Sequence, residues 1–161
     1  MEYTHVPENM SETAEDNLEE ERSGFGQQLL EGFKILVLED APDTRAVVRR
    51  WLERAGAMVQ TVESAQDAWD YLSHTVPSLI ISDIAMPGQD GISFVRELRT
   101  QKMADLKAIP ALALTAFDDR SVQTLALGAG FQDYLLKPIT SRDLVFAVLK
   151  LSVPPAGATT H

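Results

Sequence analysis

Hydrophobic residues occur along this chain in short continuous runs that alternate with segments of helical periodicity. Runs of this kind are typical of strands that are buried on both faces of a parallel sheet. They predict five strands, over residues 35–38, 58–62, 79–81, 111–114 and 133–136. Between and after the runs, apolar residues recur every three or four positions, which predicts five amphipathic helices.

Several of the predicted helices carry recognisable start signals. Pro42 stands where the first helix would begin, a position that needs no backbone N–H. Ser64 and Ser141 are predicted to cap the second and fifth helices, because a serine hydroxyl accepts an otherwise unpaired N–H of the first turn. The five helices are predicted from Pro42 to near Gly56, around 68–72, from Ile92 to about Gln101, from about Asp119 to Leu127, and from Ser141 to about Leu151.

Five strands that alternate with five helices predict an α/β fold. The expected architecture is a doubly wound parallel sheet that is covered by helices on both faces and joined by right-handed crossovers. Ligands of such sheets bind beyond the carboxyl ends of the strands. Functional polar residues are therefore expected where the strands end.

Length and composition indicate one domain in a reducing compartment. The chain has 161 residues, 45% of them hydrophobic, which is enough for a single sizeable core. It has no cysteine, so disulfides and thiolate metal sites are excluded. No apolar run approaches the roughly 20 residues that cross a bilayer, and no secretory signal pattern opens the chain. A cytoplasmic location without membrane association is expected.

The net charge of −10 is concentrated at one end of the chain. Residues 1–31 contain nine acidic side chains and the single base Arg22, which leaves −2 for the rest. A near-neutral domain argues against DNA binding, which requires clustered basic residues. We predict an acidic and largely disordered extension over 1–31, a domain over 32–152 and a short tail over 153–161.

The segment that leads into the first strand is ambiguous. Phe25, Leu29, Leu30 and Phe33 have rough helical spacing. This spacing fits a short element that docks on the domain, and a flexible linker fits it equally well.

Polar residues do follow the predicted strands. Glu39-Asp40, Ser82-Asp83, Thr115-Ala116 and Lys137-Pro138 come at the ends of the first, third, fourth and fifth strands. Each alone has an ordinary explanation as a turn or helix-cap residue, but their joint occurrence at one sheet edge favours a functional site. Crowded carboxylates require a cation, and oxygen ligands of this kind suit Mg²⁺.

These residues also fit the chemistry of phosphoryl transfer. Asp83 is the natural nucleophile, because an aspartate that attacks phosphorus gives an acyl phosphate. Lys137 and Thr115 supply a charge and a hydrogen bond for phosphate oxygens. The three histidines are too scattered in the sequence to indicate a metal site. The sequence contains no glycine-rich phosphate loop, so nucleotide binding is not expected.

From about Phe33 to Leu151, the sequence resembles the receiver domains of two-component response regulators. The resemblance rests on the segments 35–40, 82–88, 90–91, 114–116 and 136–138. It implies a flavodoxin-like (βα)5 fold with strand order 2-1-3-4-5 and a cis Lys137-Pro138 bond. It further implies a signalling domain, not an enzyme, whose only catalysis is its own phosphorylation and dephosphorylation.

The resemblance also assigns roles to individual residues. Asp83 would be the phosphoacceptor, Asp40 a direct Mg²⁺ ligand, Glu39 a ligand through water, and Ala85 a ligand through its backbone carbonyl. Thr115 and Lys137 would bind the phosphoryl group, and Thr115 and Tyr134 would form the switch. Phosphorylation would change the face made by the fourth helix, the fifth strand and the fifth helix.

The same resemblance predicts protein partners. The phosphoryl donor would be a histidine kinase or a histidine phosphotransfer protein, and the switched face would bind an unknown protein target or a second copy of the chain. Residues 29–35 and 82–88 resemble receivers at the C-terminus of hybrid histidine kinases. Because only ten residues follow Leu151, we expect a free-standing regulator or relay shuttle without its own output domain.

Two alternatives and one departure remain open. A Mg²⁺-dependent aspartate-nucleophile phosphohydrolase usually needs a second acid two residues after the nucleophile, where this chain has Ala85. An interaction scaffold that needs no phosphorylation is disfavoured, because no acceptor or metal position is lost. Ala85 and Phe117 are apolar where related domains can orient an attacking water, which predicts slow loss of the phosphoryl group.

Overall fold

The computed structural model describes residues 28–152 of the chain. Of the predicted extension over 1–31, only residues 28–31 belong to this part. Phe25 and the predicted tail over 153–161 lie outside the described residues. Within residues 28–152, no helix is both long and apolar enough to cross a membrane.

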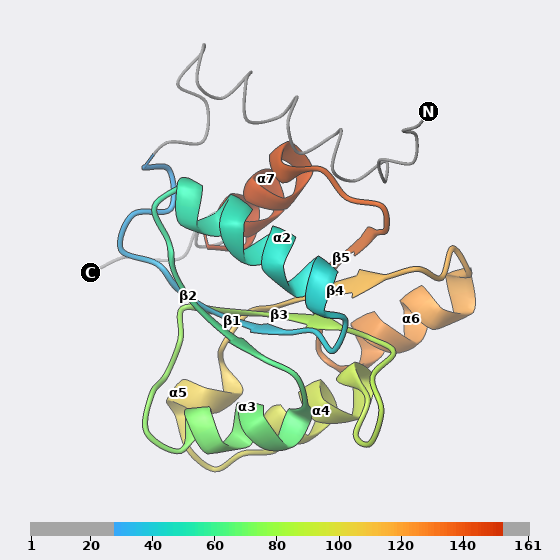
Figure 1. The fold of residues 1–161 in the computed structure, drawn as a ribbon. Helices are drawn as coiled ribbons and strands as arrows, with labels where there is room; N and C mark the ends of the chain where they lie inside the picture. Colours follow the sequence, from blue (N-terminus) through green and yellow to red (C-terminus); the bar gives the residue numbers. More distant parts are fainter. Residues whose placement is uncertain (1–27, 153–161) are drawn as a thin grey trace, which may run out of the picture.

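Five parallel strands form one sheet in the middle of the domain (Figure 1). The spatial order is β2-β1-β3-β4-β5, which confirms the predicted flavodoxin-like topology. The strands are β1 (Lys34–Leu38), β2 (Met58–Val62), β3 (Leu79–Asp83), β4 (Ala111–Thr115) and β5 (Asp133–Leu136).

Helices cover both faces of the sheet (Figure 1). One face carries α2 (Pro42–Arg54) and α7 (Ser141–Ser152). The other carries α3 (Ala65–Leu72), α4 (Gly91–Leu98), α5 (Ala104–Lys107) and α6 (Arg120–Ala129). The four-residue α5 was not predicted, because a single helical turn is too short to show periodicity.

The central strands are buried on both sides, as their continuous apolar sequences predict. All five residues of β3 and of β4 are buried. In β1, Leu36 packs into the core beneath α3 and α4, and its neighbour Val37 packs into the core beneath α2 and α7. Alternate residues of each strand therefore pack into the two opposite cores. This alternation fixes which residue lies at the end of each strand.

The segment before β1 docks on the domain. Leu30 is fully buried in the core beneath α2 and α7, and its N–H donates to the carbonyl of Ala55 at 2.8 Å. Phe33 packs against the same core, and its carbonyl accepts the N–H of Met58 at 2.8 Å. The docking interpretation is therefore confirmed for Leu30 and Phe33, which lie in and just after a turn at residues 28–32 and not in a helix.

The helix starts agree with the sequence signals in all but one case. Pro42 opens α2, and the hydroxyl of Ser64 accepts the N–H of Asp67 at 3.1 Å. The prediction that Ser141 caps the last helix was wrong by one residue. The hydroxyl of Thr140 accepts the N–H of Asp143 at 3.1 Å, so Ser141 is the first residue inside α7. Either hydroxyl fits the sequence pattern, and only the backbone geometry distinguishes them.

Candidate functional site

Five polar residues from four strands meet at the carboxyl-end edge of the sheet. Glu39 and Asp40 follow β1, Asp83 and Thr115 end β3 and β4, and Lys137 follows β5. One carboxylate oxygen from each of the three acids lies within 4.8 Å of the other two. The structure therefore brings the predicted acids into one cluster, with the predicted lysine beside it.

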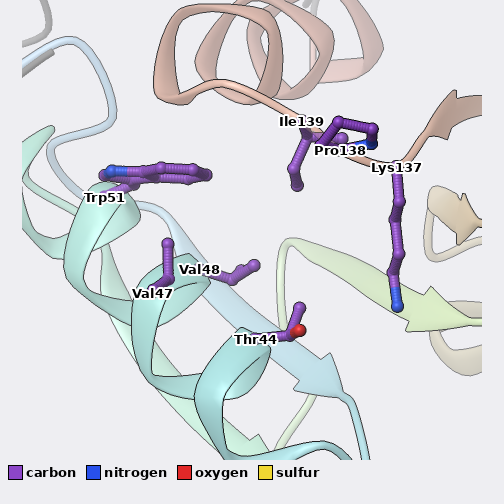
Figure 2. A pocket seen from close by; sticks show the side chains of 7 residues that line it. All are labelled: Thr44, Val47, Val48, Trp51, Lys137, Pro138 and Ile139. Atoms are coloured by element: carbon purple, nitrogen blue, oxygen red, sulfur yellow. The ribbon is translucent and has the colours of Figure 1, made fainter. Parts of the chain in front are cut away.

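Lys137 connects the last strand to the acid cluster. Its ammonium lies 3.1 Å from Oε1 of Glu39 and 3.4 Å from Oδ2 of Asp83. The side chain extends from the β5–α7 connection toward the strands (Figure 2). The Lys137-Pro138 peptide bond is cis, as the resemblance implied. One ammonium thus offsets part of the negative charge of two carboxylates.

The acids of the cluster differ in their exposure to solvent. The side chain of Glu39 is fully buried, while 10% of the Asp83 side chain is exposed and Asp40 is half-buried. Burial raises the pKa of the Glu39 carboxyl above its usual value, and the nearby charge of Asp83 raises it further. The N–H of Ala41, 3.1 Å from Oε2, and the ammonium of Lys137 both oppose this rise in pKa. An additional cation would stabilise the charged form of all three acids.

Arg45 on α2 supports the loop that carries Glu39 and Asp40. Its Nη1 donates to the carbonyl oxygen of Glu39 at 2.9 Å and to that of Asp40 at 3.3 Å. Its Nη2 lies 3.7 Å from Oε2 of Glu63 on the neighbouring β2–α3 connection. The sequence reasoning missed Arg45, although its position one turn into the helix that follows the acid pair was a usable signal.

Gly91 at the start of α4 packs directly against the backbone of Asp83. Its N–H donates to the carbonyl of Ile84 at 2.9 Å. A Cβ at this position would overlap the carbonyl oxygen of Asp83 and would lie 2.9 Å from the hydroxyl of Ser82. That hydroxyl in turn donates to the Asp83 carbonyl at 2.8 Å. The glycine in the Asp90-Gly91 segment therefore has a steric reason, namely the close approach of α4 to the end of β3.

Thr115 lies beside Asp83 at the sheet edge. The register pairs Asp83 with Leu114, so Thr115 extends one residue beyond Asp83 on the neighbouring strand. Only 1% of Thr115 is exposed, and its hydroxyl accepts the N–H of Phe117 at 2.9 Å. The two apolar residues singled out from the sequence, Ala85 and Phe117, are both exposed on the loops after β3 and β4.

Tyr134 stands apart from the acid cluster. It lies on β5, is half-buried, and packs against the core beneath α3 and α4. Its hydroxyl donates to Oε1 of Gln123 on α6 at 2.8 Å. The predicted switch tyrosine therefore links β5 to α6 and makes no hydrogen bond to an acid of the cluster.

An apolar pocket of about 330 Å³ adjoins the site between α2 and the β5–α7 connection (Figure 2). It is lined by Thr44, Val47, Val48, Trp51, Lys137, Pro138 and Ile139. Lys137 is the one member of the acid and lysine cluster that contributes to it. The pocket is therefore a neighbour of the site and not the acid cluster itself.

Comparisons with known proteins agree with the fold. Residues 35–149 match the family of response regulator receiver domains. An uncharacterised 14.6 kDa protein from the sodA1 3′ region of Leptolyngbya boryana is 38% identical over 130 residues, which are 80% of this chain and 98% of that protein. The response regulator Rre1 of Synechocystis is 34% identical over 124 residues, which are 76% of this chain but only 53% of Rre1.

A solved receiver structure shows the same likeness in three dimensions. The receiver domain of a sensor histidine kinase from Pseudomonas aeruginosa PAO1 superposes with a TM-score of 0.69 at 30% identity. The match covers 75% of this chain and 98% of that domain, whose structure contains a magnesium ion in the active site cleft. On this fold and family match, the chain belongs to the response regulator receiver domains of two-component signalling.

Proposed function

We propose that Asp83 accepts a phosphoryl group, with Mg²⁺ held by the acid cluster, from the phosphohistidine of a kinase or phosphotransfer protein. The observation that carries the proposal is the position of the Lys137 ammonium, 3.4 Å from Asp83 and 3.1 Å from Glu39 within a cluster of three acids. Such a site neutralises a carboxylate nucleophile and the phosphate oxygens that approach it.

Exposure excludes Glu39 as the nucleophile, and the contact with the Lys137 ammonium favours Asp83 over Asp40. Glu39 is fully buried and cannot meet a donor, whereas the Asp83 side chain retains 10% exposure. In the proposed step, a carboxylate oxygen of Asp83 forms a bond to phosphorus while the bond from phosphorus to the donor nitrogen breaks. The product is an acyl phosphate on Asp83, and the electron pair of the broken bond stays with the donor imidazole.

The donor set fits Mg²⁺, which prefers carboxylate and carbonyl oxygens and keeps several waters. Asp40 and Asp83 would bind the ion directly, Glu39 would hold it through water, and the carbonyl of Ala85 would complete the protein ligands. When bound, the ion would offset negative charge on the acids and on the incoming phosphate. The magnesium ion in the related Pseudomonas receiver supports this assignment.

The output is proposed to leave through the face formed by α6, β5 and α7. Thr115 would bind the phosphoryl group. A shift of Thr115 would displace Tyr134, because β4 pairs with β5 over this stretch. Large apolar side chains are exposed on and next to these elements, at Phe117, Leu125, Leu127, Leu136 and Phe146. A protein target or a second copy of the chain would bind there once the switch has moved.

A small phosphodonor tests the assignment directly. With acetyl phosphate and Mg²⁺, intact mass is expected to show one added phosphoryl group on the wild type and none on Asp83→Asn. Asp90→Asn, which changes an exposed acid that caps α4, is the matched control and is expected to be phosphorylated. Chelation of Mg²⁺ should stop the reaction.

Three outcomes would reject the proposal. Phosphorylation of Asp83→Asn would show that another residue is the acceptor. Phosphorylation in excess chelator would show that the reaction needs no metal ion. Steady hydrolysis of phosphate esters by the wild type would favour the phosphohydrolase, although Ala85 occupies the position where such enzymes need their second acid.

A further inference from the structure

The sequence that precedes the described part of the chain is strongly acidic. Residues 1–27 contain eight acidic side chains and one arginine, a net charge of −7. The described part of the chain begins at Gln28, and the N–H of Leu30 is fixed to the carbonyl of Ala55 at the C-terminal end of α2. The acidic segment is therefore tethered at one end of α2.

The charge of α2 is opposite to that of the segment. Four arginines against Asp43 and Glu53 give this helix a net charge of +2, while the other described helices range from −2 to +1. The described residues as a whole carry 13 basic and 16 acidic side chains, a net charge of −3. The positive charge of α2 is thus a local feature of an acidic domain.

Three of these arginines form one exposed surface, which we call the arginine face: Arg49, Arg50 and Arg54. Arg50 and Arg54, four residues apart, are neighbours on the helix surface, and Arg49 borders the same surface hollow. They border a shallow hollow of about 370 Å³ together with Ala46 and Glu53. Arg49 pairs with Glu53 at 3.0 Å, but Arg50 and Arg54 have no ion pair within residues 28–152. Two guanidinium groups are therefore available to a further acidic partner.

The tether is long enough for the acids to reach this face. An α-helix of 13 residues is about 20 Å long, and Glu21 lies seven residues before Gln28, a span of up to roughly 23 Å. A single exposed ion pair contributes only about 0.2–1 kcal/mol, but a short tether raises the effective concentration to about the millimolar range. Several weak pairs formed within one chain would then hold the segment in place.

We propose that the acidic cluster of residues 15–21 docks on the arginine face of α2 in the same chain. The segment thereby covers α2 on the side away from the sheet and competes with any other acidic protein that approaches this helix. This docking does not depend on phosphorylation of Asp83.

Paramagnetic relaxation measures the docking in the full-length chain. Because the chain has no cysteine, Ala14→Cys accepts a single nitroxide label. At about 20 mM salt, amides of residues 49–54 are expected to broaden at least severalfold more than those of α3, and the effect should vanish near 0.5 M salt, where exposed charges are screened. The charge reversal Arg50→Glu with Arg54→Glu should abolish the broadening.

A matched control separates the arginine face from the overall charge of the domain. Lys102→Glu with Lys107→Glu makes the same change in net charge beside α5, which covers the opposite face of the sheet (Figure 1), and should leave the broadening of α2 intact. Melting temperatures of both double variants confirm that they fold. Broadening located on another element, or unchanged by the α2 reversal, would overturn the proposal. Broadening of isotope-labelled chains by a separate spin-labelled chain at equal strength would overturn its intramolecular form.

Discussion

The ammonium of Lys137 lies 3.4 Å from Oδ2 of Asp83, at the ends of two strands that are separated by β4. The β5–α7 connection carries the lysine side chain back over the sheet edge (Figure 2). From the same position, the lysine also reaches Glu39, which follows β1. A single ammonium therefore contacts acids at two strand ends. Phosphorylation and metal binding should both depend on it.

Replacing Lys137 by alanine is expected to change phosphorylation and metal binding in opposite directions. Loss of a positioned cation at the phosphate oxygens should slow phosphorylation by acetyl phosphate by about 10²–10³-fold. Mg²⁺ should bind more tightly to this variant, because an ammonium that repels the ion has been removed from two of the acids. Mass spectrometry and calorimetric Mg²⁺ titration measure the two effects. Lys150→Ala, whose lysine pairs with Asp133 far from the cluster, should leave both unchanged, and weaker Mg²⁺ binding in Lys137→Ala would contradict the electrostatic argument.

Glu39 is expected to make the metal-free protein relatively less stable as the pH rises. Burial is the main cause that raises its pKa above the usual 4.5. The folded state therefore holds this proton more tightly than the unfolded chain, so the contribution to stability is present below about 4.5 and is lost as the pH rises through the raised pKa. Urea unfolding in chelator, compared between wild type and Glu39→Gln, measures the difference. The exposed Glu63→Gln is the control, and a pH dependence that Glu39→Gln leaves unaltered would exclude Glu39 as its source.

The same proton should compete with Mg²⁺. Lowering the pH from neutral through the raised pKa of Glu39 should weaken Mg²⁺ binding to the wild type, because a protonated Glu39 no longer helps to hold the ion. In Glu39→Gln, Mg²⁺ binding at neutral pH should be about 10–100-fold weaker than in the wild type, and its dependence on pH should be smaller. Titration calorimetry across this pH range is the measurement, and an equal pH dependence in both proteins would count against this role.

Gly91→Ala should disturb the site through the backbone of Asp83. The new methyl group would overlap the Asp83 carbonyl, and relief of such overlap typically costs about 1–3 kcal/mol of unfolding free energy. Gly128→Ala in α6 is the control, because a Cβ there meets nothing within 4 Å and should add up to about 1 kcal/mol through helix propensity. Chemical denaturation of both variants tests the contrast. Equal stability of the two variants would show that α4 shifts to accept the methyl group.

The sheet edge was predictable because parallel strands end on the same side, so residues that follow apolar runs must converge. Glu39, Asp83 and Lys137 were found in this way. Arg45 was missed although it follows the acid pair by one helical turn, because side-chain patterns do not show which residue binds backbone carbonyls. Gly91 was noted only as part of the resemblance, and its close approach to Asp83 could not be derived from the sequence. The cap at Thr140 was missed for a related reason, since neighbouring hydroxyls differ only in backbone conformation.

The loops after β3 and β4 predict a slow loss of the phosphoryl group. Hydrolysis requires a water molecule in line with the bond between phosphorus and Asp83, and a polar side chain two residues after Asp83 or Thr115 can orient that water. The methyl group of Ala85 and the ring of Phe117, both exposed at these positions, can neither donate nor accept a hydrogen bond. The phosphorylated wild type in Mg²⁺ buffer should therefore persist for minutes or longer, as followed by intact mass after removal of the donor.

A polar side chain at position 85 should shorten this lifetime. We expect Ala85→Asn to accelerate dephosphorylation by about 10–100-fold, at or below the lower limit of the roughly 10²–10⁴-fold that positioned acid and base groups contribute to proton transfer. Ala108→Asn, at an exposed position that follows α5 and lies outside the acid cluster, is the control and should not alter the rate. A wild-type lifetime of only seconds would show that water is already well placed without help from either loop. An unchanged rate in Ala85→Asn would leave Phe117 as the residue that excludes water from the bond between phosphorus and Asp83. Phe117 lies two residues after Thr115, and its backbone N–H donates to the Thr115 hydroxyl.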